Sequence, residues 1–274
     1  MFVANTEEDG ELYSSRLRWS QWQNPYLWHN NEDGSGMAGY VDVNDIEGKI
    51  VSIKKIGDIL AVYKERGIIA ISYTGGDTVF SKELVTTKAG LVSPNAIIVL
   101  PHSHIFVGRD NIYEFDGNTV TPIGDPIRKW FFEDLTSIDR ILGYYNESSK
   151  DIVFAYDNTG KDSINRNRAI TYNTFTHTWS VRDMEVTAIG DFCENDDLII
   201  DEVDPEYDSE EMQNTMIDSS LYKKEDLVPM VGDEHGNLYK LSGYADSRGD
   251  YDGWVISKTH HMGDPLHIKR LMRI

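Results

Sequence analysis

The chain has 274 residues, of which 40% are hydrophobic, and a formal net charge of −20 at pH 7. No apolar run approaches the ~18 residues of a membrane-spanning helix, so no membrane insertion is expected. The first residues show neither a basic nor an apolar signal region, which predicts synthesis in the cytoplasm. The acidic excess disfavours general affinity for nucleic acid, because phosphate binding depends on clustered Lys and Arg. An acidic wall can still let DNA slide past without binding it.

Short strand-like runs at residues 2–4, 12–13 and 16–19 begin the chain, with an acidic turn at residues 7–10 after the first. A segment rich in aromatic residues follows, with Trp22 and Trp28 on either side of Pro25. Two interpretations stay open for these rings. They fill the space between neighbouring sheets, or they form a subunit-contact or ligand-stacking patch.

Side-chain alternation on a strand at residues 16–20 places Leu17 and Trp19 on one face, and Arg16 and Arg18 on the other. The apolar face is predicted to support the fold, and the polar face to take part in assembly. The predicted interface residues are therefore Arg16, Arg18, Trp22 and Trp28.

A strand–turn–strand pattern at residues 107–117 recurs along the chain. Its Asn-Ile-Tyr sequence at 111–113 is matched by Asn-Leu-Tyr at 237–239, and residues 63–75 are a looser copy. Aligning Tyr73 with Phe115 gives a step of 115 − 73 = 42 residues. This step falls within the ~40–45 residues of one four-stranded propeller blade.

Strand-like runs separated by turn residues group into such blades. The runs lie at 50–56, 59–62, 67–73 and 78–85; at 96–100, 104–107, 111–115 and 119–120; at 141–145, 151–156, 169–172 and 178–181; at 186–189 and 227–231; and at 254–260 and 267–274. The predicted fold is an all-β propeller of about five or six blades with incomplete terminal blades. It forms one domain over residues 1–274, with an acidic loop insertion at 194–224.

Residues 126–135 are predicted to form a short helix between two blades. Asp125 is the expected N-cap and Pro126 the first helical residue. Ile127, Trp130 and Phe131, with residue 135, are expected on one apolar face.

Two features of the sequence could serve as sites of chemistry. His102 and His104 alternate on a strand and could hold a metal with His260 or His261, but a strand–turn junction is the favoured interpretation. Residues 246–253 resemble a calcium loop, although a solvated turn is favoured. No catalytic, cofactor-binding or metal-ligating residue is therefore predicted.

Five stretches occur in an order that resembles a known family: residues 16–20, 59–66, 91–96, 107–117 and 172–180. They are similar to the propeller region of short-tailed phage tail proteins of the nozzle or tail tubular B type. The similarity spans about residues 2–191, and residues 263–270 resemble the strand that leaves the propeller.

The resemblance implies a non-enzymatic structural protein of the virion tail. It implies a homo-hexameric ring below the portal and adaptor, which forms the DNA ejection channel and carries fibres or spikes. DNA would pass through without sequence-specific binding. The alternatives are a propeller glycan hydrolase, with carboxylates around the central axis, and a free propeller binding module.

Overall fold

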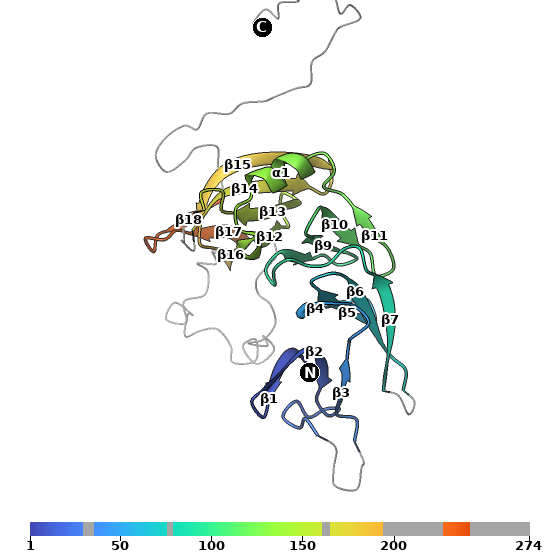
Figure 1. The fold of residues 1–274 in the computed structure, drawn as a ribbon. Coiled ribbons are helices and arrows are strands. Elements are labelled where there is room, and N and C mark those ends of the chain that lie inside the picture. The colour runs from blue at the N-terminus through green and yellow to red at the C-terminus, as the bar shows by residue number, and fades with distance from the viewer. Residues whose placement is uncertain (30–35, 76–78, 161–164, 194–226, 242–274) are drawn as a thin grey trace, which may run out of the picture. The chain divides into compact units, whose positions relative to one another are not determined.

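The computed structural model describes residues 1–29, 36–75, 79–160, 165–193 and 227–241. Their strands form five antiparallel sheets, with one short α-helix and one 3₁₀ turn between the third and fourth sheets (Figure 1). This confirms the predicted all-β, propeller-like fold. The described residues all belong to one compact unit, Met1–Leu241, and none of their helices is long and apolar enough to cross a bilayer.

Three sheets have four strands each, paired in chain order. They are formed by β4 (Ile50–Ile56), β5 (Ile59–Lys64), β6 (Ile68–Tyr73) and β7 (Phe80–Thr86); by β8 (Ile97–Val99), β9 (His104–Val107), β10 (Ile112–Phe115) and β11 (Val120–Pro122); and by β12 (Leu142–Asn146), β13 (Asp151–Tyr156), β14 (Arg166–Asn173) and β15 (Thr178–Val186). These are the three complete blades expected from the sequence.

The first and last sheets have three strands in the described part of the chain. The first contains β1 (Phe2–Glu8), β2 (Glu11–Trp19) and β3 (Gly39–Asp42), and the last contains β16 (Ala188–Cys193), β17 (Leu227–Gly232) and β18 (Leu238–Lys240). The acidic insertion at 194–224 and the expected strands at 254–260 and 267–274 lie outside the described residues.

The repeat seen in the sequence is a repeat of sheets. Tyr73 and Phe115, which the 42-residue step aligns, are the last residues of the third strands β6 and β10. First strands of consecutive sheets also contact one another, since β1 contacts β4, and β12 contacts both β8 and β16. Contact between successive first strands is the arrangement of radial blades.

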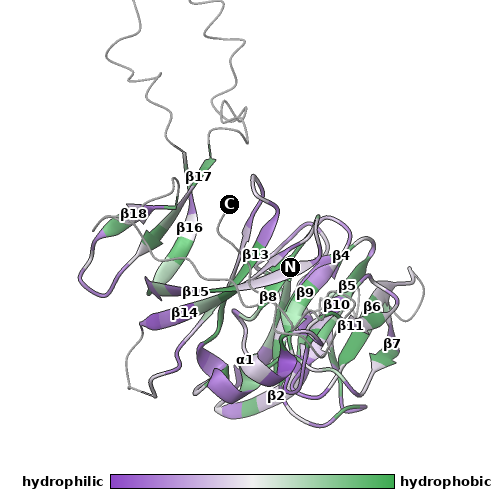
Figure 2. Ribbon diagram, turned by 90° about the horizontal axis from the view of Figure 1, so that it is seen from above, coloured by the Kyte–Doolittle hydropathy of each residue, from purple (hydrophilic) through white to green (hydrophobic). Residues whose placement is uncertain are grey.

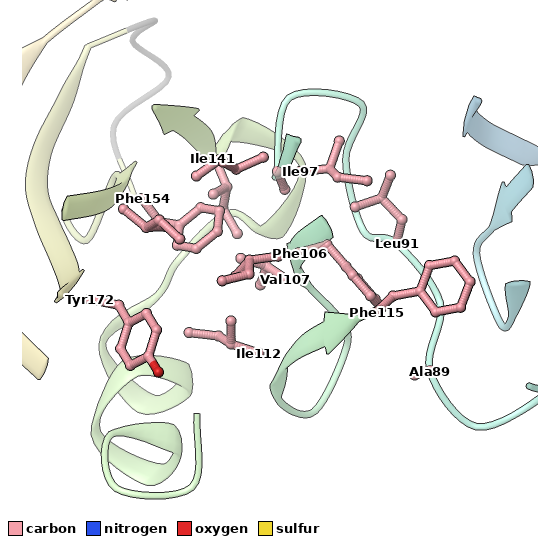
Figure 3. Packing of buried hydrophobic residues seen from close by; sticks show 14 of the residues in the cluster. Ala89, Leu91, Ile97, Phe106, Val107, Ile112, Phe115, Ile141, Phe154 and Tyr172 are labelled. Carbon is pink, nitrogen blue, oxygen red and sulfur yellow. The ribbon is translucent and has the colours of Figure 1, made fainter. Parts of the chain in front are cut away.

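Apolar clusters fill the space between consecutive sheets. One cluster joins the first and second sheets around Leu17, and another joins the fourth and fifth around Val153. The largest joins the second, third and fourth sheets, and Figure 3 shows Phe106, Phe115 and Phe154 in it. Figure 2 shows β5 and β6 coloured as mostly hydrophobic, whereas α1 (Arg128–Asp134) is mostly hydrophilic. Strands in the middle of the array are therefore covered on both faces.

The helix differs from its prediction in two details. It begins at Arg128 after the N-cap Ile127, without a side-chain cap, so the assignments of Asp125 as N-cap and Pro126 as the first helical residue are both wrong. Asp125 instead accepts a hydrogen bond from the buried Asn111 side chain, at 2.8 Å. Trp130 is 39% exposed rather than part of the packed face. Ile127 and Phe131 are buried in the core, and Leu135 packs against the same cluster, as predicted.

A buried lysine fixes the linker between the first and second sheets. The Lys64 side chain, at the end of β5, is almost fully buried, and its ammonium donates to the backbone oxygens of Val43 and Ile46, both at 2.6 Å. It also donates to the Ser15 hydroxyl at 3.0 Å. The Lys64 ammonium therefore provides hydrogen bonds to three oxygens of the first sheet and its linker that point into the interior.

Lys64→Met should destabilise the protein, because it keeps most of the aliphatic chain but removes these donors. Hydrogen bonds to charged groups contribute about 1.5–3 kcal/mol each, so we expect a loss of at least about 2 kcal/mol in urea unfolding. Lys82→Met is the matched control. Lys82 pairs at the surface with Asp45 of the same linker, at 2.7 Å, and its loss should cost less than about 1 kcal/mol. Equal losses for the two variants would contradict the assignment.

A buried histidine links the second and third sheets. His104 in β9 is fully buried, and its Nε2 donates to the Lys55 carbonyl oxygen at 3.1 Å. Its Nδ1 then accepts from the Tyr63 hydroxyl at 2.8 Å, which defines a neutral ring. Burial lowers the pKa of His104 and raises that of Tyr63, so both groups stay neutral at pH 7.

Stability should decrease on mild acidification in part because of His104. An unfolded histidine has a pKa of about 6.5, and the folded pKa is lower, so below about pH 6.5 the unfolded chain binds a proton that the folded chain does not. We expect the difference in urea midpoint between about pH 7.5 and about pH 5.5 to shrink in His104→Gln. His102→Gln, at an exposed position two residues away, should leave it unchanged. The same pH dependence in all three proteins would rule out this role.

Candidate interaction surface

The two faces of β2 differ as predicted. Leu17 is fully buried in the cluster between the first and second sheets. The half-buried Trp19 ring packs edge-on against Phe80 of β7, with centroids 4.9 Å apart, and its indole N–H donates to the Met37 carbonyl oxygen. A Cβ at Gly39 would lie 2.9 Å from this ring, so glycine lets Trp19 lie over β3. Trp19 therefore supports the fold.

On the opposite face, Arg16 is bound entirely within the first sheet. Its Nε and Nη2 donate to the two carboxylate oxygens of Asp42 at 2.8 and 3.0 Å, and Nη1 donates to Glu8 at 3.1 Å. Its guanidinium lies between the rings of Tyr13 and Tyr40, 3.8 and 4.0 Å from their centroids. Such a bidentate, stacked arrangement suits arginine and not lysine.

Arg18 connects this network to the aromatic segment that follows β2. Its Nη1 donates to Glu8 at 2.7 Å, and its Nη2 donates to the Trp28 carbonyl oxygen at 3.0 Å. Its Nε is buried without a hydrogen-bond partner in the structure. Arg18 and Trp28 therefore come together, as two of the four predicted interface residues.

The carboxylates of the network are held in their ionised form. The hydrogen bond from Arg16 is the main cause that lowers the pKa of Asp42. For Glu8, partial burial opposes ionisation, but hydrogen bonds from Thr6 and Arg18 leave the pKa lowered. The ionised carboxylates of Asp42 and Glu8 therefore stabilise the fold at neutral pH, and this stabilisation is lost as the pH falls through their lowered pKa values.

A compact loop displays two aromatic rings beside this network. The Gln21 side chain accepts hydrogen bonds from the backbone N–H groups of Met37 and Ala38, which fixes the loop to the start of β3. A backbone hydrogen bond from Gln21 to the Leu27 carbonyl oxygen, at 2.7 Å, closes the loop. Trp22 is 68% exposed and Tyr26 is 91% exposed, so a closed loop holds both rings in solvent.

We name the surface formed by this loop and β3 the aromatic surface. Its aromatic residues are Trp22, Tyr26, Trp28 and Tyr40. Arg16 packs against the Tyr40 ring, and Arg18 binds the Trp28 carbonyl oxygen. The four residues predicted from the sequence are among these six, and their role at an interface stays a prediction. Tyr26 and Tyr40 were missed, although their place beside Pro25 and on the next strand was a usable signal.

No group of side chains suited to a metal ion is found among the described residues. Both ring nitrogens of His104 are engaged in hydrogen bonds, so the proposed pairing with His102 does not form. His260, His261 and residues 246–253 lie outside the described part of the chain.

A second polar cluster lies where α1 meets the fourth sheet. Asp134 accepts hydrogen bonds from the Tyr156 hydroxyl at 2.8 Å, from Asn158 at 3.2 Å and from Arg168 at 3.0 Å. Partial burial opposes ionisation, but these donors leave the pKa of Asp134 lowered. With all its partners within the chain, this cluster fixes the helix to the sheet.

A cavity of about 470 Å³ lies between the β9–β10 turn and α1. Its charged lining has both signs, with Phe132 as the aromatic member: Arg109, Asp110, Asp125, Arg128, Lys129, Phe132 and Glu133. It therefore fits no single charge class of ligand.

Comparison of the sequence with models of protein families gives no match, and no curated protein is significantly similar to it.

Trp19→Ala should lower the stability of the protein and Trp22→Ala should not, because Trp19 supports the fold whereas Trp22 is exposed at the surface. Core Trp or Phe to Ala changes cost about 3–5 kcal/mol, and the half-buried Trp19 should cost about 2–3 kcal/mol in urea unfolding. Trp22→Ala should change stability by less than about 0.5 kcal/mol. If Trp22→Ala were the more destabilising variant, the assignment of the two rings would be inverted.

Proposed function

We propose that the protein is a structural subunit of the tail of a short-tailed bacteriophage, of the nozzle or tail tubular B type. The observation that carries the proposal is where the resembling stretches fall. Residues 107–117 contain the β9–β10 turn and β10, and residues 172–180 contain the turn between β14 and β15. Two of the ordered motifs therefore fall on hairpin turns of successive sheets.

In this proposal, six copies form a ring that surrounds the DNA ejection channel and contacts adaptor, fibre or spike proteins. The net charge of −20 supports passage of DNA, because acidic walls repel the phosphate backbone. The aromatic surface supports subunit contact, since exposed Trp and Tyr side chains are enriched at the centres of protein interfaces. The subunit has no enzymatic role.

Within the described residues, the directions of the pKa shifts lend no support to the propeller hydrolase. A glycosidase of the usual kind needs one carboxylic acid with a raised pKa, which protonates the leaving group. Within the described residues, every carboxyl group with a shifted pKa has it lowered: Glu8, Asp42, Asp45, Asp116, Asp134, Asp157 and Asp233. Each of them is held as an anion that accepts hydrogen bonds.

Assembly tests the proposal directly. Light scattering after size exclusion, with negative-stain microscopy, should show six-membered rings, alone or on addition of adaptor and fibre proteins. The double variant Trp22→Ala/Tyr26→Ala should weaken ring formation at least about tenfold in protein concentration, as expected for loss of interface anchors. Phe175→Ala is the control, because Phe175 is 84% exposed on the β14–β15 turn.

Two results would contradict the structural role. One is a monomer at every concentration that releases reducing sugar from bacterial polysaccharide. The other is a monomer that binds a soluble ligand but none of the tail proteins, which would support the free binding module.

A further inference from the structure

We draw no further inference here: the strongest candidate, the apolar face of the fifth sheet that bears Phe192, Met230 and Leu238 on the side away from the cluster around Val153, carries nothing, because nothing in the described part of the structure shows what covers it.

Discussion

The apolar space between consecutive sheets is the constraint on which this fold depends. A sheet in the middle of the array must cover both faces, so β4–β6 and β8–β10 contain long runs of apolar residues. Apolar packing alone does not fix how far one sheet is turned against the next, because it is non-directional. Buried polar links supply that geometry: Lys64 joins the first two sheets, and the Tyr63–His104 pair joins the next two.

Local signals explain why most strands could be predicted from the sequence. The strands of the three complete sheets are apolar runs bounded by Gly, Asp and Asn turns. The apolar run and the turn residues are both signals that act over a few residues. The wrong predictions lie where a residue distant in the sequence determines the local structure. Asp125 looked like an N-cap, but Asn111 binds its carboxylate from another turn. β14 begins at Arg166, before the predicted run at 169–172, because Arg168 binds Asp134 and Asp183 and so extends the pairing with β15.

The same limit applies to the aromatic surface. Alternation on β2 was enough to separate Leu17 from Arg16, because it is a property of one strand. It could not show that Asp42, 26 residues further on, would bind Arg16 in a bidentate pair. Nor could a cluster of tryptophans show which ring is displayed. Trp19 is covered because β7 brings Phe80 against it, whereas no such neighbour covers Trp22 within the described part of the chain.

Within the described residues, no strand pairs with the outer edge of β3, and the first sheet has features that protect such an edge from unselective pairing. Long, flat and apolar edges promote aggregation, and proteins counter this with short edge strands and charged side chains. β3 has four residues, and its Asp42 carries a charge held in place by Arg16. The proposed assembly into a tail would require such protection of an edge strand.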